Sequence, residues 1–298
     1  MPAALSDHYA QCAQWTAQWI HVSTPVKASS PEELWKEVET TAGLHPHPLR
    51  HNGTDFELRL VSFPEEHSQT TMGTGWVLLI RQLGKPKQPK SKNRKGHPAR
   101  QALTRGPSNY HLIRSGRIGP SDMKARLDTA PGLTSKRVLL IGAGAIGSVI
   151  ADQLTRAGIG GLTIIDQDVL EPGNLVRHAS NLSFVGAAKS HAAATLATQV
   201  NPYLEVRAHV LPVGSTVCGA EQRATLSDEY DQADLIIDAT AEVGVQRLTA
   251  SLARQVGKPW IGAWATNGAH GGAVIRVPRA LTPDLGHGVC LITRLLGG

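Results

Sequence analysis

The feature that most constrains the fold is the run from Arg137 to Asp166, where apolar and amphipathic stretches alternate around a glycine-rich turn. RVLLI predicts a short strand, SVIADQLTRAG an amphipathic helix and LTIID a second strand. Between strand and helix, Gly142, Gly144 and Gly147 have the spacing G-x-G-x-x-G. The first glycine permits a tight turn, the second lets backbone approach a phosphate, and the third brings helix and strand together. The run therefore predicts a nucleotide-binding strand–helix–strand unit.

The same alternation continues to the end of the chain. Further strands are expected in LEVRAHVL, LIIDAT, WIGAWA and GAVIRV, with helices in AKSHAAATLATQVN and VGVQRLTASLARQVG. Residues 135–298 are therefore expected to form an α/β, Rossmann-like domain with a mostly parallel sheet and crossover helices.

A smaller α+β accessory domain is expected over residues 1–84. FELRLVSF and GWVLLIRQ predict strands, and SDHYAQCAQWTAQWIHV predicts a helix with Trp15 and Trp19 on one face. Residues 85–134 are expected to form a basic loop and an Arg-rich linker.

Charge and composition narrow the functional classes. The net charge of +6 arises mainly from residues 85–100, which hold seven Lys or Arg and no acid. No aromatic residue interleaves these charges, so we expect a solvated loop rather than a nucleic-acid contact. The chain has no run of 18 apolar residues, no signal-like start and only three cysteines. A cytoplasmic protein without a membrane span or a disulfide scaffold is expected.

Polar residues follow the second strand of the glycine-turn unit. Asp166 ends that strand 19 residues past Gly147, where a carboxylate can accept hydrogen bonds from ribose hydroxyls. Asp168, Asn174, Arg177 and Lys189 come next. Each taken singly has an ordinary explanation, as a turn residue, a helix cap or a surface charge. Together, the two cations suit a triphosphate better than a dinucleotide.

A further carboxylate ends a later strand of the same sheet. Asp238 is the last strand residue of LIIDAT, and the carboxyl ends of parallel strands meet at the edge where such sheets bind ligands. This position suits a carboxylate that holds Mg²⁺.

From Arg137 to about Arg276 the chain resembles the ThiF/MoeB family of adenylating enzymes. The motifs that carry the resemblance are GAGAIGS, IIDQDVLEPGNLVRH, VGAAKSHAAATLATQVNP and LIIDAT, over somewhat under half of the chain. The resemblance implies that ATP and Mg²⁺ are bound. It also implies that the C-terminal carboxylate of a small protein or peptide, often ending in Gly-Gly, is adenylated.

The resemblance also implies a role for each motif residue. Gly142, Gly144 and Gly147 would lie along the nucleotide with Asp168 beside them, Asp166 would hold the ribose, Asn174, Arg177 and Lys189 would face the phosphates, and Asp238 would bind Mg²⁺. A homodimer is implied as well, in which an Arg of the partner subunit completes the site. Arg114 and Arg117 precede the turn at the offset of that Arg.

Two departures from the family pattern leave alternatives open. The second Asp of the family's D-x-x-D motif is replaced by Ala241, which Glu242 follows, and the chain ends about 160 residues after Ser135, short of the family's domain. A truncated relative that binds nucleotide or a partner without turnover is one alternative. An NAD-dependent oxidoreductase is another, but it leaves four of the polar residues without a role: Asn174, Arg177, Lys189 and Asp238.

Overall fold

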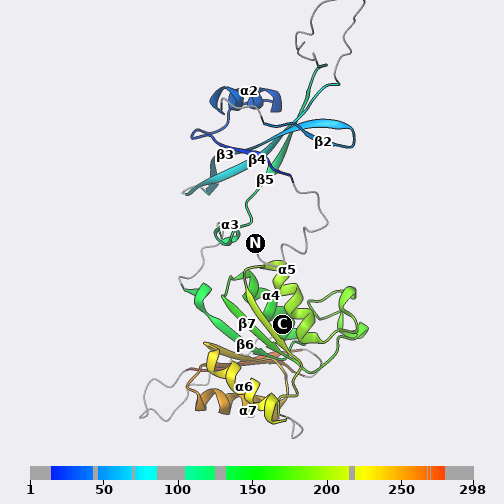
Figure 1. Ribbon diagram of the computed structural model, residues 1–298. Helices are drawn as coiled ribbons and strands as arrows, with labels where there is room; N and C mark the ends of the chain where they lie inside the picture. Colours follow the sequence, from blue (N-terminus) through cyan, green and yellow to red (C-terminus); the bar gives the residue numbers. More distant parts are fainter. Residues whose placement is uncertain are drawn as a thin grey trace, which may run out of the picture. The chain divides into compact units, whose positions relative to one another are not determined.

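The computed structural model describes residues 15–42, 46–68, 71–85, 105–124, 132–214, 219–266, 268 and 270–278. These residues divide into an N-terminal unit, residues 15–124, and a C-terminal unit, residues 132–278 (Figure 1). The three cysteines and all but the first residue of the basic segment 85–100 lie outside the described residues. Among the described residues, no helix has both the length and the apolar character needed to cross a membrane.

The C-terminal unit is built on a six-stranded sheet in which five strands are parallel. The strand order is β11-β10-β9-β6-β7-β8, and only β11 runs antiparallel to its neighbour. The strands are β6 (Arg137–Ile141), β7 (Gly161–Ile165), β8 (Glu205–His209), β9 (Leu235–Asp238), β10 (Trp260–Ala265) and β11 (Gly272–Val277). This arrangement confirms the predicted Rossmann-like sheet.

Helices cover both faces of this sheet (Figure 1). The helices are α4 (Ala145–Arg156), α5 (Lys189–Val200), α6 (Ala220–Gln232) and α7 (Val243–Gln255). Alternate residues of β6 enter two separate cores: Leu140 packs with α4 and α5, while Leu139 packs with α6 and α7. Because both faces are buried, β6 is apolar from Val138 to Ile141, as in other parallel sheets.

The order of the strands places a crevice at the ends of β6 and β9. From β6 the chain continues outward through β7 and β8 and later returns to form β9 and β10 on the other side. Open α/β sheets bind ligands at such a reversal, beyond the carboxyl ends of the strands. Gly142 follows β6, Asp166 follows β7 and Asp238 ends β9, so these residues lie at this edge.

The N-terminal unit is a mixed sheet with one helix on it. The strands are β1 (Gln18–His21), β2 (Leu49–His51), β3 (Thr54–Ser68), β4 (Thr71–Gln82) and β5 (Asn109–Ser115). The helix on the sheet is α2 (Pro31–Ala42), and a short helix, α3 (Pro120–Lys124), follows β5. Strand β1 is parallel to β3, and the other pairs are antiparallel. Leu34, Trp35 and Val38 of α2 are buried against Val61 and Leu79 of the sheet.

Two expectations for this region differ from the structure. The predicted helix through Trp15 and Trp19 is wrong where the structure describes it, because Gln18–His21 is a strand in which Ile20 is buried and Trp19 is exposed. Residues 1–14 lie outside the described residues. Residues 85–134, expected to be loop and linker, contribute β5, whose backbone pairs with β4 although most of its side chains are exposed.

Asp238 ties α7 to the centre of the sheet. Its carboxylate is fully buried, and Oδ2 accepts a hydrogen bond from Thr249 Oγ1 of α7 at 2.6 Å. Oδ1 accepts from the backbone N of Thr240 at 3.0 Å and from Thr240 Oγ1 at 2.7 Å. Thr249 Oγ1 in turn accepts from Trp260 Nε1 of β10. The network satisfies a buried carboxylate inside the fold.

We predict that Asp238→Asn destabilises the C-terminal unit in the absence of any ligand. The amide nitrogen of Asn replaces an acceptor by a donor, which leaves buried groups unsatisfied at a cost of about 1–3 kcal/mol. Native-state hydrogen exchange of the β6 amides measures the free energy of unfolding of this unit. Asp152→Asn is the control, because Asp152 of α4 is partly exposed and makes a surface ion pair with Arg156, so the expected change is within about 0.5 kcal/mol. Equal effects of the two substitutions would contradict the account of Asp238.

Candidate functional site

The three glycines of the turn have different structural requirements. Gly142 has φ +89°, and a Cβ there would lie 2.9 Å from the backbone of Ala239. A Cβ on Gly147 would lie 1.9 Å from the carbonyl oxygen of Gly142. A Cβ on Gly144 would meet no described atom within 4 Å. The fold therefore requires glycine at 142 and 147, whereas the space beside Gly144 is left open.

That space belongs to a cavity of about 370 Å³, which we call the glycine-turn cavity. It lies where β6, β7 and β9 end, the edge at which the predicted residues meet. The residues lining it are Ile141, Gly142, Gly144, Ile165, Asp166, Gln167, Asp168, Lys189, Leu211, Val213, Ala239, Thr240, Glu242 and Val245. Of the predicted site residues, the structure thus brings Gly142, Gly144, Asp166, Asp168 and Lys189 together.

Asp166 connects β7 to the glycine turn. Its Oδ2 accepts a hydrogen bond from the backbone N of Ala143 at 2.6 Å, and its Oδ1 accepts from the backbone N of Asp168 at 2.7 Å. Each carboxylate oxygen has two lone pairs, so both retain acceptor capacity toward the cavity. The carboxylate therefore shapes the turn and can also accept from ligand hydroxyls.

Lys189 is the one cationic side chain among the described residues lining the cavity. It is the first residue of α5, and its side chain is 14% exposed. Its Nζ lies 2.8 Å from Asp168 Oδ2, and its backbone N donates to the carbonyl oxygen of Asp168. This ion pair holds the ammonium group at the cavity wall while Asp168 itself is largely exposed.

Asn174 and Arg177 lie on the loop between β7 and α5 but do not line the described cavity. Asn174 ends a short 3₁₀ helix (Pro172–Asn174), and its Oδ1 accepts from the backbone N of Glu171 at 3.1 Å. The backbone N of Arg177 donates to the carbonyl oxygen of Asn174, and the Arg177 side chain is exposed.

His178, the next residue, is 7% exposed and contacts the turn directly. Its Nε2 lies 2.7 Å from the carbonyl oxygen of Ala143, and its Nδ1 accepts from the backbone N of Ser180 at 3.0 Å. Burial lowers the pKa of the imidazole, an effect that the hydrogen bond to Ala143 opposes. Sequence reasoning gave this residue no role, because its contact with the turn is visible only in the fold.

Asp238, predicted to bind Mg²⁺, does not line the cavity. Its carboxylate is fully buried and accepts three hydrogen bonds inside the fold, so its surroundings do not fit a ligand for a metal ion in the cavity. Two other residues line the cavity nearby, Thr240 and Glu242, and the Glu242 side chain is exposed. The intervening Ala241 has φ +61°. The sequence offered one indication of a role for Glu242: it directly follows Ala241, which replaces the second Asp of the family's D-x-x-D motif.

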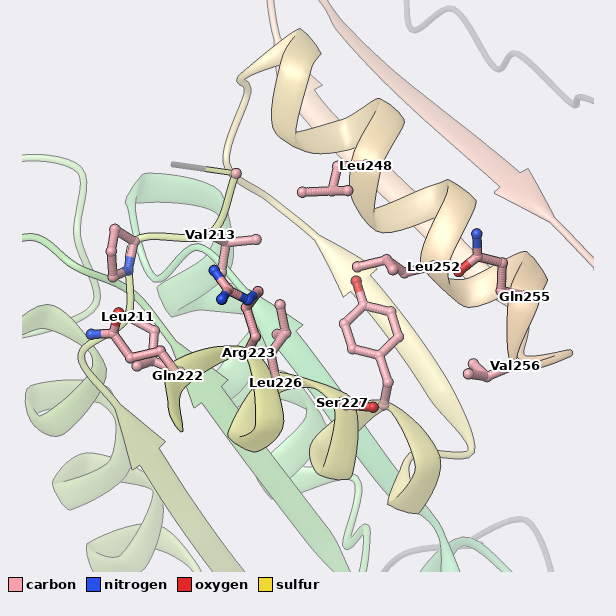
Figure 2. A pocket seen from close by; sticks show the side chains of 13 residues that line it. Leu211, Val213, Gln222, Arg223, Leu226, Ser227, Leu248, Leu252, Gln255 and Val256 are labelled. Carbon is pink, nitrogen blue, oxygen red and sulfur yellow. The ribbon is translucent and has the colours of Figure 1, made fainter. Parts of the chain in front are cut away.

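A second cavity of about 450 Å³ lies between α6 and α7 (Figure 2). Figure 2 shows Leu226 of α6 and Leu248 and Leu252 of α7 along its walls. It shares Leu211 and Val213 with the glycine-turn cavity, but Arg223 is the one charged residue among its described lining. Burial raises the pKa of its Tyr230 hydroxyl, which therefore stays protonated. The carboxylates, the lysine and the open turn line the glycine-turn cavity, so that cavity is the candidate functional site.

Comparisons with known proteins identify the family of the C-terminal unit. The model of the ThiF family matches residues 124–285, which include every strand of the sheet. The uncharacterized protein y4oA of Sinorhizobium fredii is 32% identical over 87% of this chain and 43% of its own length.

Two further relatives have descriptive names. The ATP-dependent ubiquitin transferase-like protein Cap2 of Enterobacter hormaechei is 32% identical over 55% of this chain and 26% of its own. The molybdopterin-synthase adenylyltransferase of Escherichia coli is 31% identical over 40% of this chain and 45% of its own. The chain thus spans less than half the length of each of these relatives. With more than half of its residues matched by the family model, this chain belongs to the ThiF family.

Proposed function

We propose that the C-terminal unit binds ATP in the glycine-turn cavity and transfers the adenylyl group to the C-terminal carboxylate of a small protein or peptide. The observation that carries the proposal is the open space at Gly144 beside Lys189, at the reversal point of the sheet. No packing contact explains a glycine there, whereas close approach of a phosphate does. The start of α4 directs backbone N–H groups at the same space, which favours an anion.

The described side chains match the parts of ATP. Asp166 accepts from the ribose hydroxyls, and Lys189 neutralises phosphate charge once its ammonium group is shared with Asp168 and the ligand. Leu211, Val213 and Val245 supply an apolar wall for the base. Asn174 and Arg177 lie outside the described cavity, so we expect both side chains to turn toward the phosphates when ATP binds. The Arg177 side chain is exposed, and Asn174 would exchange its hydrogen bond to Glu171 for one to the ligand.

The chemistry needs positioning and charge stabilisation rather than a general base. A carboxylate of the acceptor, ionised at neutral pH, attacks the α-phosphorus of ATP. A bond forms between the carboxylate oxygen and phosphorus, and the bond to the β-phosphate oxygen breaks. The products are an acyl adenylate and pyrophosphate. Lys189 and Arg177 stabilise the charge that develops on the displaced pyrophosphate.

We infer that Glu242, rather than Asp238, faces the Mg²⁺ ion that accompanies the nucleotide. Mg²⁺ is commonly held by one or two carboxylates together with substrate phosphates, and it neutralises phosphate charge when bound. Glu242 lines the cavity, and its carboxylate makes no hydrogen bond or ion pair to another described residue. Asp238 serves the fold instead, through Thr240 and Thr249.

The acceptor and the assembly are proposed on the family resemblance alone. A small protein with a C-terminal Gly-Gly is the expected acceptor, and a homodimer is the expected assembly. The two arginines at the offset of the family's exchanged Arg belong to the N-terminal unit. Arg114 Nη2 pairs with Glu65 Oε1 at 2.7 Å, and Arg117 lies 3.4 Å from Asp122. Either would have to leave its partner to reach a second subunit's site.

Gly144→Ala and Gly147→Ala separate ligand binding from folding. Gly144→Ala is expected to fold normally, because its Cβ meets no described atom, and to weaken ATP binding by about tenfold or more. Gly147→Ala is expected to lower stability by about 1–3 kcal/mol or more through its clash with Gly142. Calorimetric titration with ATP and thermal unfolding measure the two effects. Unchanged ATP affinity of Gly144→Ala would argue against a phosphate beside this residue.

Glu242→Gln tests the metal assignment. Without metal, the variant is expected to bind ATP within about twofold of the wild-type affinity. Mg²⁺ is expected to increase this affinity, and the Mg²⁺ concentration needed for half of the increase should be about tenfold higher in the variant. Titrating Mg²⁺ into protein with a fluorescent ATP analogue measures this concentration. Glu221→Gln, at an exposed position of α6 outside the cavity, is the matched control. An unaltered Mg²⁺ requirement in Glu242→Gln would show that another group holds the metal.

ATP–pyrophosphate exchange tests the proposed reaction. With Mg²⁺, labelled pyrophosphate and a panel of carrier proteins ending in Gly-Gly, exchange is expected with one carrier and is expected to fall at least a hundredfold in Lys189→Ala. Arg156→Ala, an exposed cation of α4 paired with Asp152, should exchange like the wild type. Clear ATP binding without exchange for any carrier or peptide would favour the non-catalytic alternative over adenylation.

A further inference from the structure

We propose that His178 is a positioning residue that clamps the phosphate-binding turn to the Asn174–Arg177 loop, and that protonation of its imidazole releases the clamp. The inference rests on the proposed function, because it concerns how the same cavity holds a nucleotide. Its basis is the set of hydrogen bonds around Ala143 and the burial of the His178 side chain beside the glycine turn.

The hydrogen bonds define the tautomer of His178. The backbone N–H of Ser180 can only donate, so Nδ1, which it contacts at 3.0 Å, carries no proton. The neutral ring therefore has its proton on Nε2, which donates to the carbonyl oxygen of Ala143 at 2.7 Å. Both ring nitrogens are satisfied in this one protonation state.

Hydrogen bonds from two different residues hold the peptide units on both sides of Ala143. The backbone N of Ala143 donates to Asp166 Oδ2, and its carbonyl oxygen accepts from His178. Ala143 lies between Gly142 and Gly144 and is fully buried. The orientation of the Gly144 backbone, which faces the cavity, thus depends on both contacts.

The same clamp positions the loop that carries the cation. His178 follows Arg177 directly, and the backbone N of the next residue, Ala179, donates to Ser148 Oγ in the first turn of α4 at 3.1 Å. The backbone N of His178 donates to the carbonyl oxygen of Asn174. The loop is therefore attached to the turn at residues 178 and 179, immediately beside Arg177.

Protonation disrupts this arrangement at a defined atom. The imidazolium carries N–H groups on both nitrogens, so its Nδ1–H would face the N–H of Ser180. Two charged groups act on the ring: Lys189 of α5 disfavours its protonation, and Asp166 after β7 favours it. The glycine turn and the first turn of α4 contribute no titratable side chain. Arg177, adjacent in sequence, is exposed.

The direction of the pH effect follows from burial. The folded protein lowers the pKa of His178 below the ordinary value of 6.5, so the neutral form is favoured in the fold. The clamp is complete above that ordinary value and is lost as the pH falls below it. ATP affinity should therefore decline on acidification because His178 becomes protonated, in addition to any effect of protonating ATP.

The test compares His178→Gln and His178→Leu with the wild type by ATP titration at pH 7.5 and 5.5. Gln can donate to Ala143 and accept from Ser180 but does not titrate, so its affinity at pH 7.5 is expected within about threefold of the wild type. His178→Leu is expected to bind about tenfold more weakly at both pH values. Acidification from pH 7.5 to 5.5 is expected to weaken ATP binding about tenfold more in the wild type than in His178→Gln. Protonation of ATP affects both proteins equally, so the difference between them reports on His178.

His209→Gln is the matched histidine control, because His209 pairs with Glu229 away from the turn and its variant should keep the wild-type pH dependence. An equal pH dependence in His178→Gln and the wild type would overturn the proposal. Wild-type affinity of His178→Leu at pH 7.5 would do so as well.

Long-range ¹⁵N correlation spectra of the ligand-free protein provide a second readout. The Nε2–H tautomer is expected for His178 at pH 7.5, and the Nδ1–H tautomer or a charged ring would overturn the clamp. If the clamp is found but the wild type does not bind ATP, the proposed function fails while the clamp stands.

Discussion

The hydrogen bond from Ala143 N to the Asp166 carboxylate is the contact on which the site depends. It joins the turn after β6 to the end of the neighbouring strand β7, and so helps to shape the crevice beyond the carboxyl ends of the strands. Gly142 can approach the backbone of Ala239 because it has no side chain and a positive φ. The carboxyl ends of β6, β7 and β9 therefore meet around one cavity. Its wall carries three carboxylates, a lysine that is ion-paired with one of them, and several apolar side chains.

Much of this arrangement could be predicted from the sequence. The strand–turn–helix–strand order, the three glycines and Asp166 are local features, because their spacing alone determines how β6, α4 and β7 fold together. The joint position of Asp168 and Lys189 was also predicted, and the structure adds that they form an ion pair. The N-terminal unit was harder. Strand β5 has mostly exposed side chains and is recognised only through its backbone pairing with β4.

The contacts of Asp238 and His178 and the position of Glu242 at the cavity could not be predicted, and the reasons differ. Asp238 is the last residue of a strand, but its carboxylate accepts a hydrogen bond from the hydroxyl of Thr249, 11 residues further along the chain. Glu242 reaches the cavity through a backbone bend at Ala241, which has a positive φ unusual for a residue with a side chain. His178 contacts Ala143, 35 residues earlier in the chain, through a hydrogen bond that no local pattern encodes. Each role depends on tertiary contacts.

The central claim is that the glycine-turn cavity is built for a triphosphate rather than for a dinucleotide. Calorimetric titration of the purified chain with ATP in the presence of Mg²⁺, alongside NAD⁺ under the same conditions, tests this claim directly. The account predicts saturable binding of one ATP per chain and binding of NAD⁺ at least about tenfold weaker, because Lys189 and the loop of Arg177 meet charge that NAD⁺ does not carry. Tighter binding of NAD⁺, or no binding of ATP, would contradict it.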